Sequence, residues 1–278
     1  MPLPNFLVIG ASRAGTTSLY HYLGAHPEIF VPAIKETNYF AHEGRRDERF
    51  PVVRAEAYAA LFAGAGAARA RGEVSPIYLT RSAVAAPRIA RELPGVRLVA
   101  SLRHPAERAF SNYLLQYRYG RDRRSVEEAF GSPDAYADYV REGGYAARVR
   151  DYAERFPRER IRILLFEDLG RDPGAALRDL FAFLGVDPDF RTDTSVRHNP
   201  GGVARRAWLN DLLLRAAPAL GPHAPAWLRR LGRRLRDANE APPPRLPPEL
   251  RARLVAYYRV DVLALQDWLG RDLSAWLV

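Results

Sequence analysis

The stretch F-L-V-I-G-A-S-R-A-G-T-T-S-L-Y-H-Y, residues 6–22, decides the fold of this chain. Its first residues, Phe6 to Ile9, form a continuous apolar run that is too short for a helix and predicts a buried strand. After Gly10 comes a loop of small residues, and from Gly15 the pattern is helical. Apolar side chains then recur at helical spacing, at Leu19, Tyr22 and Leu23. A strand, a small-residue loop and a helix N-terminus together form a cradle for an anion, so we expect a phosphate here.

The composition of the loop favours a phosphate over a simple turn. Gly10 and Gly15 let the backbone approach an anion closely. Three consecutive hydroxyl residues add donors: Thr16, Thr17 and Ser18. A nucleoside-triphosphate loop has Lys directly after its second glycine, whereas this chain has Thr16 there and Arg13 as its cation. The alternative is a strand–turn–helix joint in which the glycines serve only the turn.

A second phosphate site is predicted in the middle of the chain. Val96 to Leu102 reads as a strand that delivers Arg103, and Ser111 follows eight residues later. Pro105 suits the first turn of a helix, on which Ser111 shares a polar flank with Arg108. The buried stripe of that helix is expected at Ala106, Ala109, Phe110, Tyr113, Leu114 and Tyr117. A guanidinium and a hydroxyl together can clamp a phosphate; alternatively, Arg103 caps local carbonyls and Ser111 is solvated.

Composition limits the class of protein. The chain has 278 residues, 47% of them hydrophobic, which suits one domain over 1–278, with an α/β core over 1–190 and a mostly helical closing segment over 191–278. It has no cysteine, which excludes disulfides and thiolate metal sites, and its histidines and acidic residues show no metal-ligand spacing, so no metal is expected. No apolar run is long enough to span a bilayer and no signal peptide precedes the first strand, so we expect a cytoplasmic protein.

The net charge of +10 favours anionic partners such as a nucleotide, an acidic substrate, nucleic acid or a membrane surface. Lys35 is the only lysine among 42 basic residues, so an arginine cluster alone indicates little about function. The aromatic residues fall on helical core stripes and not on an exposed stacking platform, so nucleic acid is not expected as a partner.

The loop R-A-G-T-T-S, residues 13–18, resembles the 5′-phosphosulfate loop of sulfotransferases that use 3′-phosphoadenosine 5′-phosphosulfate (PAPS), with Arg13 in place of the usual lysine. Arg103 and Ser111 match the motif by which that family binds the 3′-phosphate. The segment K-E-T-N-Y-F, residues 35–40, is similar to one in the heparan and sugar sulfotransferases, and the tail resembles the closing helix of bacterial members. The resemblance spans nearly the whole chain.

This resemblance implies transfer of a sulfonate group from PAPS to a hydroxyl of a carbohydrate, lipid or small molecule, without a metal. It implies that the cofactor is held at Arg13, Gly15, Thr16, Thr17, Ser18, Arg103 and Ser111. It also implies that Glu36 is the general base, with Lys35 near the transferring group. The alternative for this pair is a structural ion pair. Val74 stands where some members have a lysine. If that lysine contacts the sulfonate, the resemblance implies that Lys35 or an arginine makes this contact here.

Strands alternating with helices predict a P-loop-like α/β fold: a central parallel β-sheet flanked by helices on both faces, with a C-terminal helical extension. A helix is expected between Asp172 and Gly185, and a stripe of buried side chains at Tyr145, Val149, Tyr152 and Phe156. Two other functions are alternatives to sulfonate transfer. A nucleotide-dependent phosphotransferase would ordinarily carry Gly-Lys-Ser/Thr, and a non-catalytic basic protein would bind an acidic polymer or nucleic acid.

Overall fold

The computed structural model describes residues 3–44, 49–131, 139–195, 203–206, 209, 212, 232, 234–235 and 238–278. Its chain divides into two compact units. The first comprises Met1–Pro105, Gly144–Asn199 and Tyr257–Val278, and the second Ala106–Gly143 and Pro200–Ala256. The single domain and its division at residue 190 stay predictions, and much of the closing segment lies outside the described residues.

The first unit is built on a five-stranded sheet with the strand order β2-β3-β1-β4-β5, in which every pair is parallel. The strands are β1 (Phe6–Gly10), β2 (Ile29–Phe30), β3 (Ala70–Val74), β4 (Arg97–Leu102) and β5 (Ile161–Leu165). The predicted α/β fold with a central parallel sheet is therefore confirmed. β2 lies in a segment that reads as a loop, because only two of its residues pair with β3.

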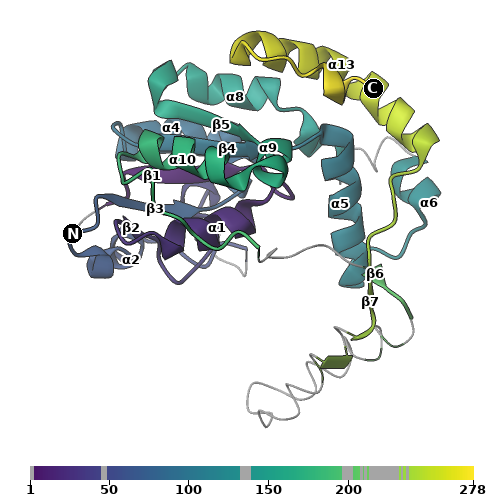
Figure 1. Ribbon diagram of the computed structural model, residues 1–278, viewed down its shortest axis with the longest axis horizontal. Helices are drawn as coiled ribbons and strands as arrows, with labels where there is room; N and C mark the ends of the chain where they lie inside the picture. The colour runs from purple at the N-terminus through teal and green to yellow at the C-terminus, as the bar shows by residue number, and fades with distance from the viewer. Residues whose placement is uncertain are drawn as a thin grey trace. The chain divides into compact units, whose positions relative to one another are not determined.

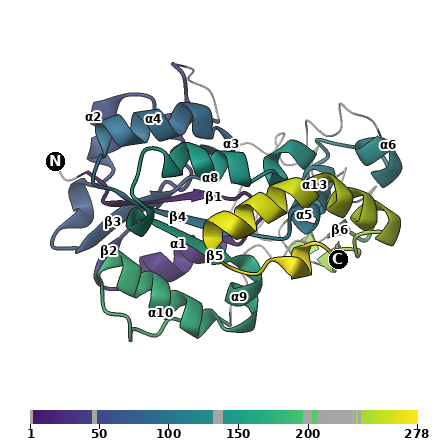
Figure 2. The same ribbon diagram turned by 90° about the horizontal axis from the view of Figure 1, so that it is seen from above.

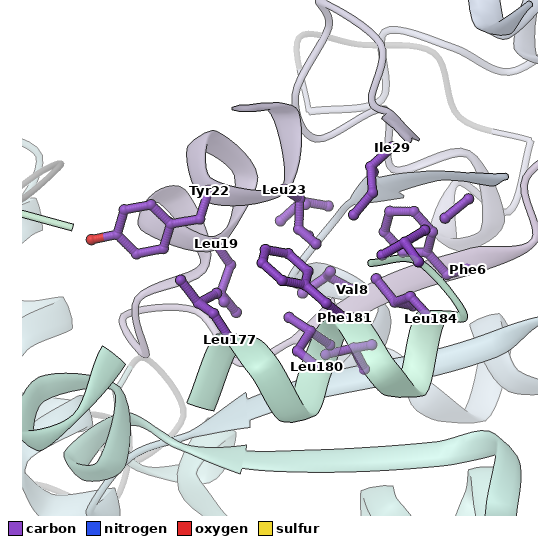
Figure 3. Close-up of a cluster of buried hydrophobic side chains, with 14 of the residues drawn as sticks. Phe6, Val8, Leu19, Tyr22, Leu23, Ile29, Leu177, Leu180, Phe181 and Leu184 are labelled. Atoms are coloured by element: carbon purple, nitrogen blue, oxygen red, sulfur yellow. The ribbon is translucent and has the colours of Figure 1, made fainter. Parts of the chain in front are cut away.

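β1 lies at the centre of the sheet because all of its residues can be buried on both faces. Its side chains alternate between the two faces, as they do in any strand. Phe6 and Val8 join a hydrophobic cluster with Leu19 and Leu23 of α1 (Thr16–Ala25) and side chains of α10 (Pro173–Leu184) (Figure 3). This cluster attaches α1, and with it the predicted anion loop, to the sheet.

Helices cover both faces of the sheet. α1 and α10 lie on one side, and α4 (Ser82–Glu92) and α8 (Ala146–Ala153) lie on the other (Figures 1 and 2). The predicted stripe at Tyr145, Val149, Tyr152 and Phe156 is buried. Shorter elements of this unit are α2 (Ala55–Ala60), α3 (Ile77–Thr80), α9 (Phe166–Arg171) and the 3₁₀ turns η1 (Tyr39–Ala41), η2 (Ala63–Ala65), η5 (Arg158–Arg160) and η6 (Ser274–Trp276).

The ends of α10 show how local sequence sets an element's bounds. The carboxylate of Asp172 accepts the backbone N–H of Ala175 at 2.9 Å, and Pro173 occupies the first helical position. Gly185 ends the helix with φ 76°, the left-handed conformation that glycine adopts without steric cost. Both predicted caps are confirmed.

The second unit contains most of α5 (Pro105–Arg118) together with α6 (Val126–Gly131), the turn η4 (Arg141–Gly143), the antiparallel pair β6 (Val203–Ala204) and β7 (Glu240–Ala241), and the start of α13 (Pro248–Leu269). The predicted stripe of α5 is buried from Ala106 to Tyr113, but Tyr117 is 39% exposed. α13 supplies the predicted C-terminal helical extension. None of the described helices is long and apolar enough to cross a membrane.

The prediction that Arg108 lies on a polar flank of α5 is wrong. Its side chain is completely buried, and its guanidinium donates to Glu142 Oε2 at 2.9 Å and to the carbonyl of Tyr139. An ion pair and a backbone acceptor offset the cost of burying the charge. Both partners lie more than 30 residues further along the chain, so helical periodicity cannot indicate them.

Candidate functional site

The strand order identifies one position, at the carboxyl ends of the strands, where a ligand is expected. From β1 the chain moves outward to β2 and β3, whereas from β4 it moves to β5 in the opposite direction. The strand order therefore reverses between β1 and β4. In open parallel sheets, ligands bind in the crevice at the carboxyl ends of the strands where this reversal occurs. The residues there are the loop 11–15 after β1 and Arg103 after β4.

Hydrogen bonds from β4 fix the loop that follows β1. The amide of Ala11 donates to the carbonyl of Ser101 at 2.7 Å, and the buried Ser101 hydroxyl donates to the carbonyl of Ala14 at 2.6 Å. The loop is thus held at both ends by one residue of the neighbouring strand. This arrangement sets the direction in which α1 begins.

The N-terminus of α1 has the features of an anion-binding end. Gly15 is its N-cap with φ 79°, no side chain caps it, and its first turn contains no acidic residue. The positive end of the helix dipole and the first amides of Thr16, Thr17 and Ser18 are therefore not neutralised by a side chain of the helix itself. Thr16 is buried, and Thr17 and Ser18 are half-buried.

Gly15 and Arg103 both lie against the ring of Phe166. The guanidinium of Arg103 lies over this ring at 4.9 Å, and its Nη1 donates to the carbonyl of Arg13 at 3.4 Å. A Cβ added to Gly15 would lie 3.0 Å from the same ring. Arg13 itself has φ 68°, a conformation that is rare for a residue with a side chain. The Arg103 guanidinium thus contacts the backbone of the loop that carries Arg13.

Phe166 is missing from the predicted site because its segment reads as a strand that continues through residue 166. In the structure β5 ends at Leu165, and Phe166 begins α9. The ring is therefore released from the sheet at the same edge as the anion loop. An aromatic residue directly after a buried strand is the one signal that the sequence offers.

Tyr145 is a second residue that sequence reasoning reads as core alone. Its buried hydroxyl donates to the carbonyl of Arg103 at 3.0 Å, and its amide donates to Asp261 of α13 at 2.7 Å. Burial raises the pKa of Asp261, and the amides of Tyr145 and Ala146 oppose that shift. Trp276 packs against the rings of both Tyr145 and His104. The C-terminal segment therefore supports the backbone at Arg103.

Lys35 and Glu36 lie at the carboxyl end of β3, the strand beside β1. The amide of Glu36 donates to the carbonyl of Val74 at 3.1 Å, while Val74 itself is buried in the core. Lys35 Nζ donates to Glu36 Oε1, so the two side chains form an ion pair. The Glu36 side chain is 49% exposed and the residue has φ 62°. An ion pair and an accessible carboxylate are both present.

Ser111 lies on α5, half-buried, in the second unit, whereas Arg103 belongs to the first. Its pairing with Arg103 at a phosphate stays a prediction. Over the described residues, no three His, Asp or Glu side chains gather in a group that could hold a metal ion.

Comparison with known proteins agrees with this fold. A family model described as "Sulfotransferase family" matches residues 4–190. A crystal structure of a sulfotransferase from Alicyclobacillus acidocaldarius shares 31% identity with a TM-score of 0.76, and 99% of each chain is covered.

Two curated relatives are similar over shorter shares of their length. The membrane-associated sulfotransferase kil1 of Dictyostelium discoideum is 35% identical over 40% of this chain and 22% of its own length. The bifunctional heparan sulfate N-deacetylase/N-sulfotransferase 4 of Mus musculus is 27% identical over 99% of this chain and 31% of its own length. The chain therefore spans less than a third of either protein.

The geometry at Gly15 yields a test of the loop. Gly15→Ala is expected to lower the free energy of unfolding by about 1–3 kcal/mol, because a side chain is strained at this φ and its Cβ crowds Phe166. Urea denaturation measures this difference. Gly170→Ala is the matched control, since an added Cβ there meets no atom within 4 Å. Equal midpoints for the two variants would contradict the left-handed conformation at Gly15.

Proposed function

Since the chain belongs to the sulfotransferase family, we propose that it transfers a sulfonate group from PAPS to a hydroxyl of an acceptor. One observation carries the proposal. The uncapped N-terminus of α1, the backbone of Arg13 and the guanidinium of Arg103 meet where the strand order reverses. An anionic ligand at this edge would have donors on both sides.

The N-terminus of α1 and the arginine that follows β4 support a donor with phosphates at two positions. We assign the 5′ end to the amides and hydroxyls of Thr16, Thr17 and Ser18, with Gly15 leaving room for close approach. We assign the 3′-phosphate to the guanidinium of Arg103 and the hydroxyl of Ser111. PAPS supplies an activated sulfonate whose leaving group is a phosphate.

Arg13 and the α1 amides would stabilise the negative charge that develops on the departing phosphate oxygen. The planar guanidinium of Arg13 can donate two parallel hydrogen bonds, where the lysine usual in this family offers a point charge. Hydrogen-bond donors that already point at the developing charge do not need to reorient during the reaction. The two hydrogen bonds between Ser101 and the loop hold the loop in place.

Glu36 is the proposed general base. Its half-exposed carboxylate is accessible to an acceptor, and Lys35 bonds to Oε1, so the second oxygen, Oε2, would take the hydroxyl proton. Lys35 would also lie near the transferring group. Carbohydrates are the first acceptors to test, because one relative is named for heparan sulfate. Lipid and small-molecule hydroxyls complete the panel.

The decisive experiment follows two labels in parallel. The protein is incubated with ³⁵S-labelled PAPS and a panel of carbohydrate, lipid and phenolic acceptors, and with γ-³²P-labelled ATP, Mg²⁺ and the same panel. We expect sulfur label on an acceptor and no phosphorus label. Phosphorus transfer without sulfur transfer would establish the alternative, a phosphotransferase.

Glu36→Gln tests the base. The amide cannot take a proton, so kcat should fall about 10²–10⁴-fold, while the affinity for adenosine 3′,5′-bisphosphate (PAP) changes little. Steady-state kinetics and calorimetry measure the two quantities. Glu56→Gln removes an exposed carboxylate of α2 and should leave both unchanged. Near-normal turnover of Glu36→Gln would exclude Glu36 as the base.

Arg103→Ala tests the second phosphate. Loss of a charge-assisted contact worth about 1.5–3 kcal/mol should weaken PAP binding roughly 10–100-fold and leave adenosine 5′-phosphate binding nearly unchanged. Titration calorimetry with both nucleotides gives the ratio. Arg178→Ala, an exposed arginine of α10, is the control for lost positive charge. If both nucleotides lose affinity equally, Arg103 does not recognise the 3′-phosphate.

A further inference from the structure

Glu73, next to the last residue of β3, is a buried carboxylate that the mechanism above does not use. Its side chain is 1% exposed. Four hydroxyls donate to it: Thr37 at 2.5 Å and Ser75 at 2.8 Å to Oε2, and Tyr58 at 2.9 Å and Tyr78 at 2.7 Å to Oε1. Burial raises the pKa of Glu73, and the hydroxyl hydrogen bonds oppose that shift. The hydrogen bonds from these donors offset the cost of burying the carboxylate.

Three of the four donors also hold the segment 36–40. Thr37 is the residue after Glu36, and its hydroxyl oxygen lies 3.4 Å from the amide of Tyr39. The amide of Asn38 donates to the Ser75 hydroxyl at 3.2 Å, and the amide of Phe40 donates to the Tyr78 hydroxyl at 3.4 Å. Glu73 thus orients the hydroxyls that accept the backbone of this segment.

The segment needs such support. Glu36 has φ 62° and Asn38 has φ 56°, so two residues with side chains adopt the left-handed conformation within three positions. Such conformations persist only where the surrounding structure enforces them. The Glu36 side chain is half-exposed, with Lys35 as its ion-pair partner, so its location is set mainly by its backbone.

We propose that Glu73 is the positioning residue that holds Glu36 in the geometry for accepting the proton of the acceptor hydroxyl. The inference rests on the function proposed above. Glu73 acts through Thr37, Ser75 and Tyr78. Because it is buried, it touches neither the sulfonate donor nor the acceptor substrate. Its loss should therefore lower kcat and leave nucleotide binding intact, because the nucleotide is held at β1 and β4 while Glu73 supports only the β3 end of the site.

The test compares two substitutions that each remove one hydroxyl from the same buried carboxylate. Thr37→Val removes the one donor to Glu73 that itself belongs to the segment 36–40. Tyr58→Phe removes a donor from the other carboxylate oxygen and keeps the ring that stacks on Tyr39. The two variants should lose similar thermal stability, whereas only Thr37→Val disturbs the segment. Thr37→Ser restores the hydroxyl and serves as the rescue.

We expect Thr37→Val and Glu73→Gln to lower kcat at least about 10-fold, with PAP affinity within about twofold of the wild type. Thr37→Ser and Tyr58→Phe should retain wild-type kcat within about twofold. Hydrogen exchange followed by mass spectrometry should show faster exchange of amides 36–40 in Thr37→Val and Glu73→Gln alone. If Glu73→Gln does not fold, the comparison of Thr37→Val with Tyr58→Phe decides.

Equal loss of kcat in Thr37→Val and Tyr58→Phe would overturn the inference, because the carboxylate would then matter only for stability. Unchanged exchange of amides 36–40 in Thr37→Val would overturn it as well. Failure of the proposed function gives a different result: wild-type protein would then transfer no sulfonate and bind no PAP. In that case the exchange data alone determine whether Glu73 holds the segment.

Discussion

The hydrogen bonds that β1 makes to β3 on one side and β4 on the other are the constraint on which the site depends. Parallel pairing puts the carboxyl ends of all three strands at one edge, so three segments far apart in sequence emerge side by side. The pairing leaves little room at Gly72, where a Cβ would lie 2.4 Å from the carbonyl of Phe6. A glycine at this register position therefore lets β3 come close enough to bring the Glu36 segment to the same edge.

Backbone strain is concentrated at that edge. Arg13, Glu36 and Asn38 all adopt positive φ, and each belongs to a segment that follows or is tied to the end of a central strand. Strain of this kind costs free energy that packing elsewhere must offset, and it is found where a fixed geometry serves function. The segment that contains Arg13 and the segment that contains Glu36 and Asn38 are supported by different strands. β4 holds Arg13 through Ser101, and β3 holds Glu36 and Asn38 through Glu73 and its hydroxyls.

The parts of the site that follow from local sequence could be predicted. An apolar run, a glycine and three hydroxyl residues are neighbours in the chain, so β1, its loop and the start of α1 are predictable from spacing alone. Interactions between distant residues could not be predicted. Tyr145 supports Arg103 from 42 positions away, and Glu73 binds Thr37 across 36. Hydropathy marks Tyr145 as buried but says nothing of where its hydroxyl points, and it gives no sign that Glu73 or Arg108 is buried.

The contact of Trp276 with Tyr145 and His104 has a consequence for biosynthesis. A chain emerging from the ribosome presents β1 to β5, together with Arg13 and Arg103, long before Trp276 has been translated. Until then the backbone at Arg103 lacks the support that α13 gives through Asp261 and Tyr145. A nascent chain would therefore fold its sheet early and gain this support at Arg103 only after residue 276 has left the ribosome.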